Sequence, residues 1–302
     1  MTATDEKTGT VTTATGTADY AKNMTFVQKD GSTYTELSLE DAAAAVTAGK
    51  TVYVYTKSHS EGYGSVWSTD YDYTTYRTGI QIGEDSDVVI VAGCGIDNCG
   101  SQDSEHDGVH RFFVGKNAKI RYVEKHYGEG DGTGKRILNP VTEVYQEEGS
   151  YVDMEMVQIK GVDSTLRTTL ATLKEDATFI VHERLMTHGN QSASSEYKVE
   201  LNGKGSSTDV ISRSVAKDSS EQIFEAAIVG NKECSGHAEC DAIIMGDAHV
   251  VAVPRLDANC VDASLIHEAA IGKIAGDQLI KLMTLGLNEE EAEEQIIAGF
   301  LR

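Results

Sequence analysis

Apolar and polar residues alternate along most of the chain between residues 77 and 262, in short segments bounded by Gly, Asp and Asn. Examples are DVVIVAG, AKIRYVEKH, ATFIVHERLM and QIFEAAIVG. This alternation is typical of β-strands that bury one face. A spacing of roughly 8–12 residues, with no helical pattern in between, favours an all-β array. A barrel, a sandwich and a solenoid all fit this spacing, and no strict repeat of fixed length selects one of them.

Near the carboxyl terminus the hydrophobic period changes, starting from Ile266. Apolar residues at helical spacing predict a helix that opens at Gly276, and Gly286 is its candidate C-terminal cap. Asn288 and Glu291 form a capping-box signature for a last helix. The chain is therefore predicted to end in two helices.

The first part of the chain carries weaker signals. Residues 1–19 are rich in Thr, Ala and Gly without periodicity, which predicts a loose arm. Ser38 and Asp41 precede AAAAV and predict a short helix that ends near Gly49. The next segment, TVYVYTKS, has strand patterning. Nearby tyrosines could stack on nucleobases, but no positive charge accompanies them, so a pleated-sheet face is favoured. They are Tyr71, Tyr73 and Tyr76.

Composition and charge limit the class of protein. The 302 residues suggest about one or two domains. No apolar run reaches the ~20 residues that cross a bilayer, and no signal-peptide pattern is present, so a cytoplasmic location with reduced thiols is expected. Five cysteines at uneven spacing do not indicate a disulfide framework. With 48 acidic and 26 basic residues, a net charge of −22 disfavours nucleic acid and anionic membranes as partners.

Four motifs, in order, resemble the carboxy-terminal signature of the SufB/SufD family, scaffold subunits of the SUF machinery for iron–sulfur cluster assembly. They are GHAECDAIIMGD, Pro254, LIHEAAIGKIAGDQL and GLNEEEAEEQIIAGF. A weaker resemblance continues upstream through VAGCGI, SEHDGVHRFF, KNAKIRY and GDGTGKRILNPVT, so that it covers roughly residues 85 to 302.

The resemblance implies a mainly β fold. Its core is a right-handed parallel β-helix, with a short N-terminal α segment and a C-terminal helical tail. We accordingly expect three parts. Residues 1–50 form the arm and short helix, residues 51–265 form the β-helix, and residues 266–302 form a helical segment that docks an ATPase.

The resemblance also implies a site for a transient iron–sulfur cluster. Cys240 and Glu268 match positions that build the nascent cluster in the SufB branch, and His267 matches a histidine found in both branches. Keeping Glu268 makes the chain SufB-like. Such mixed thiolate, imidazole and carboxylate ligation suits a scaffold, because a cluster held this way is easier to hand on. For each residue alone, a buried hydrophobe or a core histidine is the competing reading.

Further cysteines and histidines carry less specific signals. Cys94 matches a family Gly-Cys at a strand end and is a candidate ligand, and Cys99 could assist it. The spacing C-x2-H-x2-C of Cys234, His237 and Cys240 could form a small zinc site, although no fourth ligand accompanies it. Ordinary buried thiols are the favoured reading of two others, Cys234 and Cys260. His106 and His110 match the region of a family histidine.

Two segments depart from motifs that they resemble. Glu147 stands roughly where the SufB branch has a sulfur-accepting cysteine, which leaves free sulfide as a possible donor. The loop GEGDGTGKR lacks the first Gly of a phosphate-binding loop, and Arg136 replaces its Ser or Thr. No ATP hydrolysis, and no other catalysis, is therefore expected of this chain.

The resemblance implies that ATP is hydrolysed by a separate ABC-type subunit, SufC, which docks on the helical tail. The candidate anchors are Leu279, Met283, Ile297 and Phe300. Pairing near HEAAIG implies a homodimer, or a SufB/SufD-type heterodimer. Two alternatives to a cluster scaffold stay open: a SufD-like structural partner without its own cluster, and a β-helix protein that acts on carbohydrates.

Overall fold

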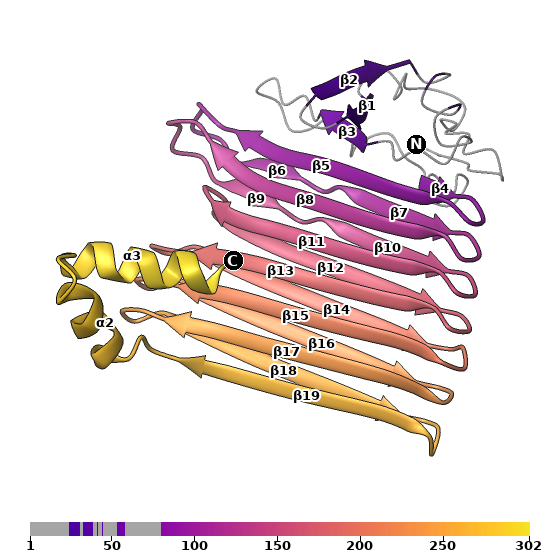
Figure 1. The fold of residues 1–302 in the computed structure, drawn as a ribbon. Coiled ribbons are helices and arrows are strands. Elements are labelled where there is room, and N and C mark those ends of the chain that lie inside the picture. Colours follow the sequence, from indigo (N-terminus) through magenta and orange to yellow (C-terminus); the bar gives the residue numbers. More distant parts are fainter. Residues whose placement is uncertain (1–23, 31–32, 39–40, 42–43, 45–52, 58–79) are drawn as a thin grey trace.

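The computed structural model describes residues 24–30, 33–38, 41, 44, 53–57 and 80–302 (Figure 1). Two long sheets run through this part of the chain. Sheet A has the strand order β19-β17-β15-β13-β11-β8-β5-β3-β1-β2, and sheet B has the order β18-β16-β14-β12-β10-β7-β4. The two short strands β6 and β9 pair with each other, and β9 also pairs with β12.

The strands of sheet A are β1 (Met24–Asp30), β2 (Thr33–Leu37), β3 (Tyr53–Lys57), β5 (Asp87–Asp97), β8 (Lys119–Glu129), β11 (Tyr151–Lys160), β13 (Thr178–Thr187), β15 (Ser206–Ala216), β17 (Cys234–Ile244) and β19 (Ala263–Gly272). The strands of sheet B are β4 (Ile80–Ile82), β7 (Val109–Val114), β10 (Val141–Gln146), β12 (Ser164–Leu173), β14 (Ser192–Leu201), β16 (Glu221–Gly230) and β18 (His249–Ala258). The short pair is β6 (Ser104–His106) and β9 (Arg136–Leu138).

From β10 onward the chain alternates between the sheets, and each strand pairs in parallel with the strand one coil earlier. Figure 1 shows the two layers stacked coil upon coil. The predicted parallel β-solenoid is thereby confirmed. The first three strands differ, because β1 pairs antiparallel with both β2 and β3.

The coil has a recurring corner that explains the turn residues between the segments. In five successive coils, from β4–β5 to β14–β15, one residue at the turn from sheet B into sheet A adopts a positive φ between 52° and 74°. Only Gly, Asn and Asp adopt this backbone readily. The residues are Asp85, Asn117, Gly149, Asp176 and Gly205. Their spacing varies from 27 to 32 residues (for example 176 − 149 and 117 − 85), so the sequence shows no strict repeat.

The core lies between the sheets, because inward and outward residues alternate along every long strand. In β11, for example, Val152, Met154 and Met156 are fully buried while their neighbours are partly exposed. The largest of the other buried side chains include Phe112, Tyr122 and Phe179. Each such burial stabilises the fold by roughly 1.5–3 kcal/mol.

The solenoid ends in two edge strands. Within the described residues, β19 pairs only with β17, and β18 pairs only with β16. Pro254 fits in β18 because an edge strand tolerates a residue that cannot donate a hydrogen bond. Apolar side chains remain exposed here, among them Val251 at 50% and Ile266 at 52%. No further coil covers this end in the part of the chain that the structure describes.

Two helices follow β19, namely α2 (Gly276–Met283) and α3 (Glu289–Phe300). The predicted capping box is present, because Asn288 Oδ1 accepts from the Glu291 N–H while Glu291 Oε2 accepts from the Asn288 N–H, each at 2.9 Å. The C-cap of α2 is Thr284, two residues before the predicted Gly286, which has a φ of +103° in the turn that follows. Residues 266–272, which we grouped with the helical segment, form the second part of β19.

Two segments within the predicted arm and short helix, residues 24–30 and 33–37, form the strands β1 and β2 instead. Ser38 Oγ accepts a hydrogen bond from the Asp41 N–H at 3.0 Å, as expected of a helix N-cap. Positions 41 and 44 are helical. Residues 1–19 of the predicted arm, the rest of this short helix and the three tyrosines Tyr71, Tyr73 and Tyr76 lie outside the described residues. Among the described helices, none has the length and apolarity to cross a bilayer.

Candidate functional site

Cys240 lies on the inward face of β17, and its side chain is only 1% exposed. Burial raises the pKa of its thiol to about 12, with the nearby carboxylates of Glu183 and Asp241 adding to the effect. The thiol is therefore protonated at neutral pH. A positive ion beside the sulfur would reverse this, because a metal deprotonates a thiol that it binds.

His267 lies on β19 on the same side as Leu265, which packs against the core. It is in register with Ala238, two residues before Cys240. Strand spacing and rise place the Cα atoms of His267 and Cys240 about 8 Å apart. Its Nδ1 is shielded from solvent and has no hydrogen-bond partner among the described residues. A buried imidazole nitrogen without a partner is what a ligand position leaves when no ligand is bound.

Glu268 points to the other side of the same strand. It follows His267 directly, and successive residues of a strand face opposite sides. It pairs in register with Glu239, an outward-facing residue, and its side chain is 69% exposed. Within one chain the structure therefore brings Cys240 and His267 to one face and places Glu268 on the opposite face.

On the outer face, Glu268 belongs to a different group. One ligand atom each from His237, Glu239 and Glu268 lies within 4.8 Å of the other two. His237 Nε2 is 4.0 Å from Glu268 Oε2, and His237 Nδ1 is 2.9 Å from Asp209 Oδ1. Partial burial and a hydrogen bond shared with Asp241 raise the pKa of Glu239. The family motif pointed to Glu268, but it gave no reason to single out His237 as its neighbour.

The outward position of His237 also shows whether Cys234, His237 and Cys240 can bind one zinc ion. Cys234 and Cys240 are both inward and buried, whereas His237 lies an odd number of residues from each. On a strand this parity puts the imidazole on the opposite face from both thiols. The zinc site considered for C-x2-H-x2-C is therefore not formed.

A second inward group surrounds Cys94 on β5. Cys94 is in register with His126, and one ligand atom each of Cys94, Glu124 and His126 lies within 4.8 Å of the others. All three are buried. Burial raises the pKa of Cys94 and lowers that of His126. For Glu124, burial alone would raise the pKa, but its contacts with His126 and His110 and the charge of Arg167 outweigh burial and hold the pKa well below its usual range.

Arg167 makes this second group a poor metal site. Its guanidinium donates to Glu124 Oε2 at 2.8 Å and approaches His126 Nδ1 at 2.8 Å. Because Arg167 can only donate, His126 Nδ1 accepts, and the neutral ring then carries its proton on Nε2. His126 could bind a metal through Nε2 only by giving up this arrangement, and the arginine charge would repel the ion.

The two inward groups are joined by a column of in-register residues. Glu124, Met156, Glu183, Ser212 and Cys240 occupy equivalent positions on β8, β11, β13, β15 and β17.

Glu183, in the middle of this column, is held by its neighbours. Its carboxylate accepts from Ser195 Oγ at 2.6 Å, from Ser212 Oγ at 2.8 Å and from Tyr197 Oη at 3.0 Å, and Arg167 Nε is 3.6 Å away. Sequence reasoning missed these buried charges. The signal that could have revealed them is a glutamate at a strand position that alternation assigns to the core, as in AKIRYVEKH and ATFIVHERLM.

Of the remaining candidates, His110 contacts the group around Cys94 through Glu124. His106 is buried, and His110 Nδ1 is 3.1 Å from Glu124 Oε1. Cys99 is exposed beside Asp97, and Cys260 is half-buried. Glu147, at the place of the family's sulfur-accepting cysteine, is an exposed residue paired with a lysine.

The tail presents a partly different surface from the one predicted. Ile297 is buried, and Leu279 and Phe300 are half-buried, so they pack the tail itself. Of the four candidate anchors, Met283 alone is exposed, at 43%. The prediction did not include the most exposed apolar residues nearby, Ile280 at 60% and Leu285 at 76%.

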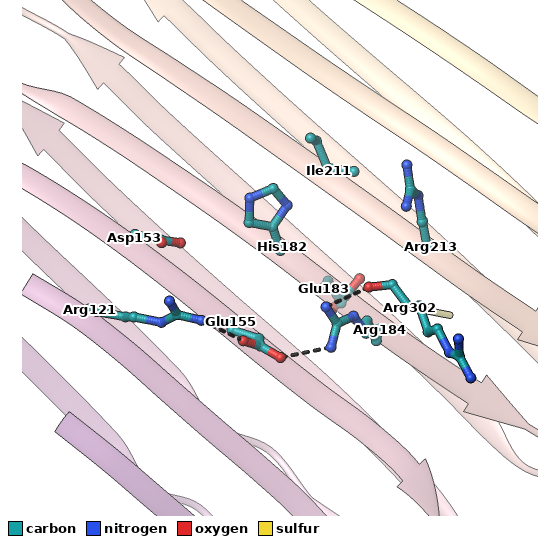
Figure 2. Close-up of a pocket in the computed structure, with 9 residues that line it drawn as sticks. All are labelled: Arg121, Asp153, Glu155, His182, Glu183, Arg184, Ile211, Arg213 and Arg302. Atoms are coloured by element: carbon teal, nitrogen blue, oxygen red, sulfur yellow. Dashed lines mark hydrogen bonds and ion pairs between the residues drawn. The ribbon is translucent and has the colours of Figure 1, made fainter. Parts of the chain in front are cut away.

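The end of the tail reaches the outer face of sheet A and lines a pocket there, shown in Figure 2. The volume of this pocket is about 340 Å³. Arg184 donates to Glu155 at 2.7 Å and to the backbone carbonyl of Arg302 at 2.9 Å. Arg121 also contacts Glu155, at 3.4 Å. The pocket borders the outer-face group, because its Ile211 is in register with Glu239.

Comparison with known proteins gives one consistent result. Residues 65–300 match the family described as SUF system FeS cluster assembly, SufBD core domain. An iron-sulfur cluster assembly SufBD family protein of Archaeoglobus fulgidus is 30% identical over 220 residues, which cover 72% of this chain and 58% of the relative. A relative of the same description from Methanothermobacter thermautotrophicus is 29% identical over 223 residues, covering 72% and 53%.

A third SufBD relative, from Methanocaldococcus jannaschii, is 31% identical over 220 residues, covering 72% of this chain and 68% of its own length. The chain thus spans between about half and two thirds of the length of these curated relatives. The family match covers well over half of the chain, and it agrees with the solenoid and its helical tail. The chain therefore belongs to the SufBD family of the SUF system of iron–sulfur cluster assembly.

Proposed function

We propose that this protein is a scaffold subunit on which iron–sulfur clusters are assembled de novo, and that it works with an ABC-type ATPase of the SufC kind. The observation that carries the proposal is the pair formed by Cys240 and the unpartnered Nδ1 of His267. Both face inward on the last two strands of sheet A, β17 and β19, in a solenoid whose family assembles clusters.

The soft thiol and the imidazole are ligands that iron–sulfur clusters accept. They lie on the last two strands of sheet A, near the uncovered end of the solenoid, whereas the group at Cys94 lies farther from that end and is neutralised by Arg167. The nascent cluster is the product that the protein carries, so few and mixed ligands favour its release.

Glu268 would join this site through pairing of the edge strands. In one copy its carboxylate faces away from Cys240. The unpaired edge of β19 and the exposed apolar residues around it, such as Val251 and Ile266, are suited to cover by a second chain. We propose a homodimer, or a heterodimer with a paralogue, built on this end. No catalysis is assigned to the chain itself, and the proposed location is the cytoplasm.

Anaerobic reconstitution with iron and sulfide tests the scaffold role. We expect Cys240→Ala to lose most of the visible absorbance and the cluster signal in Mössbauer spectra, because a thiolate ligand is gone. Cys234→Ala is the matched control, since Cys234 is a buried inward thiol on the same strand. Equal iron and sulfide content in wild type and Cys240→Ala would reject the role of Cys240.

The tail supplies the second test. A partner that docks on α2 should use its exposed apolar residues, so Ile280→Asp and Met283→Asp are expected to weaken capture of the ATPase at least tenfold. Glu290→Gln is a matched control on the exposed start of α3. Capture of the ATPase at wild-type affinity by both apolar variants would exclude this surface.

A further inference from the structure

In the single chain, the outer face of the last two strands of sheet A gathers an imidazole and two carboxylates on the side opposite Cys240 and His267. His237 and Glu239 are two residues apart on β17, so they share a face, and Glu268 is directly opposite Glu239 on β19. Their ligand atoms lie within 4.8 Å of one another. From this arrangement we infer that the outer face binds one divalent transition-metal ion through His237, Glu239 and Glu268.

Asp209 prepares the histidine for this role. It is in register with His237 on the neighbouring strand β15, and its carboxylate is 2.9 Å from His237 Nδ1. A carboxylate in this position accepts the Nδ1 proton, which leaves the lone pair of Nε2 free for a metal. Nε2 is the nitrogen that faces Glu268, at 4.0 Å. Asp209 is thus a positioning residue and not a ligand.

The two glutamates provide the electrostatic reason for a cation. Like charges directly opposite on neighbouring strands destabilise a sheet. Among the described residues, no lysine or arginine forms an ion pair with Glu239 or Glu268. Arg213 contributes only a longer-range attraction to Glu239. A divalent ion bound between the two carboxylates would remove this repulsion.

The donor set selects the class of ion. One imidazole nitrogen and two carboxylate oxygens without sulfur suit Fe²⁺, Mn²⁺ or Zn²⁺ and disfavour Cu⁺. Bonds of about 2.0–2.2 Å require neighbouring ligand atoms roughly 3–3.5 Å apart. Shifts of about 1 Å in the exposed Glu268 side chain would bring the group to that spacing. Three protein ligands leave positions open for water, and hence for release of the ion.

If the proposed scaffold role holds, this site would hold ferrous iron on the opposite face of the strands that carry Cys240 and His267. That assignment of the ion rests on the proposed function, whereas metal binding itself does not.

Titration with Co²⁺, a spectroscopic substitute for Fe²⁺ and Zn²⁺, tests the site in the intact chain. We expect one Co²⁺ per chain with a visible ligand-field spectrum. His237→Ala and Glu268→Gln should each weaken binding more than tenfold, and Asp209→Ala by about 10–100-fold. Glu225→Gln, an exposed carboxylate on β16, should leave binding unchanged. Far-ultraviolet circular dichroism verifies that each variant is folded.

Cys240→Ala separates the two sites. It should retain the Co²⁺ ion while losing the reconstituted cluster. Wild-type Co²⁺ affinity in both His237→Ala and Glu268→Gln, or loss of the ion in Cys240→Ala, would overturn the outer site. Cluster formation at limiting iron that is as fast in His237→Ala as in wild type would overturn the link to assembly, even where Co²⁺ binding is lost.

Discussion

At the scale of single residues, the inside of the solenoid is unusual because it holds charges. Arg167 is 2% exposed and lies between Glu124 and Glu183, which are equally enclosed. Burying charges costs several kcal/mol per ion unless each is paired and hydrogen-bonded. Here the hydroxyls of Ser195, Ser212 and Tyr197 complete the shell of Glu183, so the charges are tolerated.

Replacing Arg167 should therefore be far more harmful than replacing a surface arginine. We expect Arg167→Leu to lower the free energy of unfolding by about 3–5 kcal/mol at neutral pH, because it leaves two carboxylates buried without a cation. Chemical denaturation followed by circular dichroism measures this change. Arg184→Leu is the control, since its pair with Glu155 is partly exposed and contributes about 0–1 kcal/mol.

The loss of unfolding free energy in Arg167→Leu should also depend on pH, and it should become smaller as the pH falls. In the wild type the depressed pKa of Glu124 contributes stability above the pKa of the unfolded chain, and this stability is lost as pH falls through the folded pKa. Without Arg167 that contribution shrinks, so the difference between wild type and variant should be largest at neutral pH and decrease on acidification. A difference that stays constant as pH falls from 7 to about 2, well below the ordinary carboxyl pKa of about 4.3, would contradict this account of Arg167.

At the scale of elements, the tail shows how local signals specify a helix. Asn288 and Glu291 satisfy each other's backbone N–H groups at the start of α3, and three glutamates in its first turn favour the positive end of the helix dipole. Inward packing of Ala292 and Ile297 then fixes the face of α3 that meets the rest of the molecule.

Removing the cap should loosen one end of α3 only. We expect Asn288→Ala to cost about 1 kcal/mol and to speed amide hydrogen exchange in the first turn. Exchange in the last turn, near Phe300, should not change. Glu290→Ala is the comparison within the same turn, because it removes a charge without touching the capping box. Equal exchange rates in wild type and Asn288→Ala would show that tertiary packing alone holds the helix.

The same contrast explains what could be predicted from the sequence. Strand segments and the capping box rest on local patterns, so both were predicted. Solenoid stacking depends on residues about one coil apart, such as Asp176 and Gly205, and uneven coil lengths hide that repeat; family resemblance supplied it.

Predicting the candidate site also requires knowing which face of the sheet each residue points to. Motifs identified Cys240, His267 and Glu268, but the register between β17 and β19 is what assigns Glu268 to the outer face beside His237.

At the scale of the whole molecule, the net negative charge is expected to lower the stability of the fold. A chain with 48 acidic and 26 basic residues repels itself at neutral pH. Several of the described ion pairs are exposed and contribute little each, so we expect repulsion to outweigh them.

Added salt should therefore stabilise the protein. We expect the midpoint of thermal unfolding to rise as KCl increases from about 0.05 to 1 M, because the screening length falls from more than 10 Å to about 3 Å. Sucrose at matched osmolality controls for effects that do not involve charge. A midpoint that stays level or falls with KCl would mean that attractive pairs dominate.

Because the coils are stacked, the length of the solenoid is set by the number of coils. Cys94 on β5 and Cys240 on β17 are separated by five strand spacings, which at about 4.8 Å each amounts to roughly 24 Å. Since Ser164 and Ser192 occupy equivalent rungs, excising residues 164–191 would bring β14 and β15 to the places of β12 and β13 and shorten that interval by one rung. Evolution can thus adjust the reach between the two ends in discrete steps, without redesigning either of them.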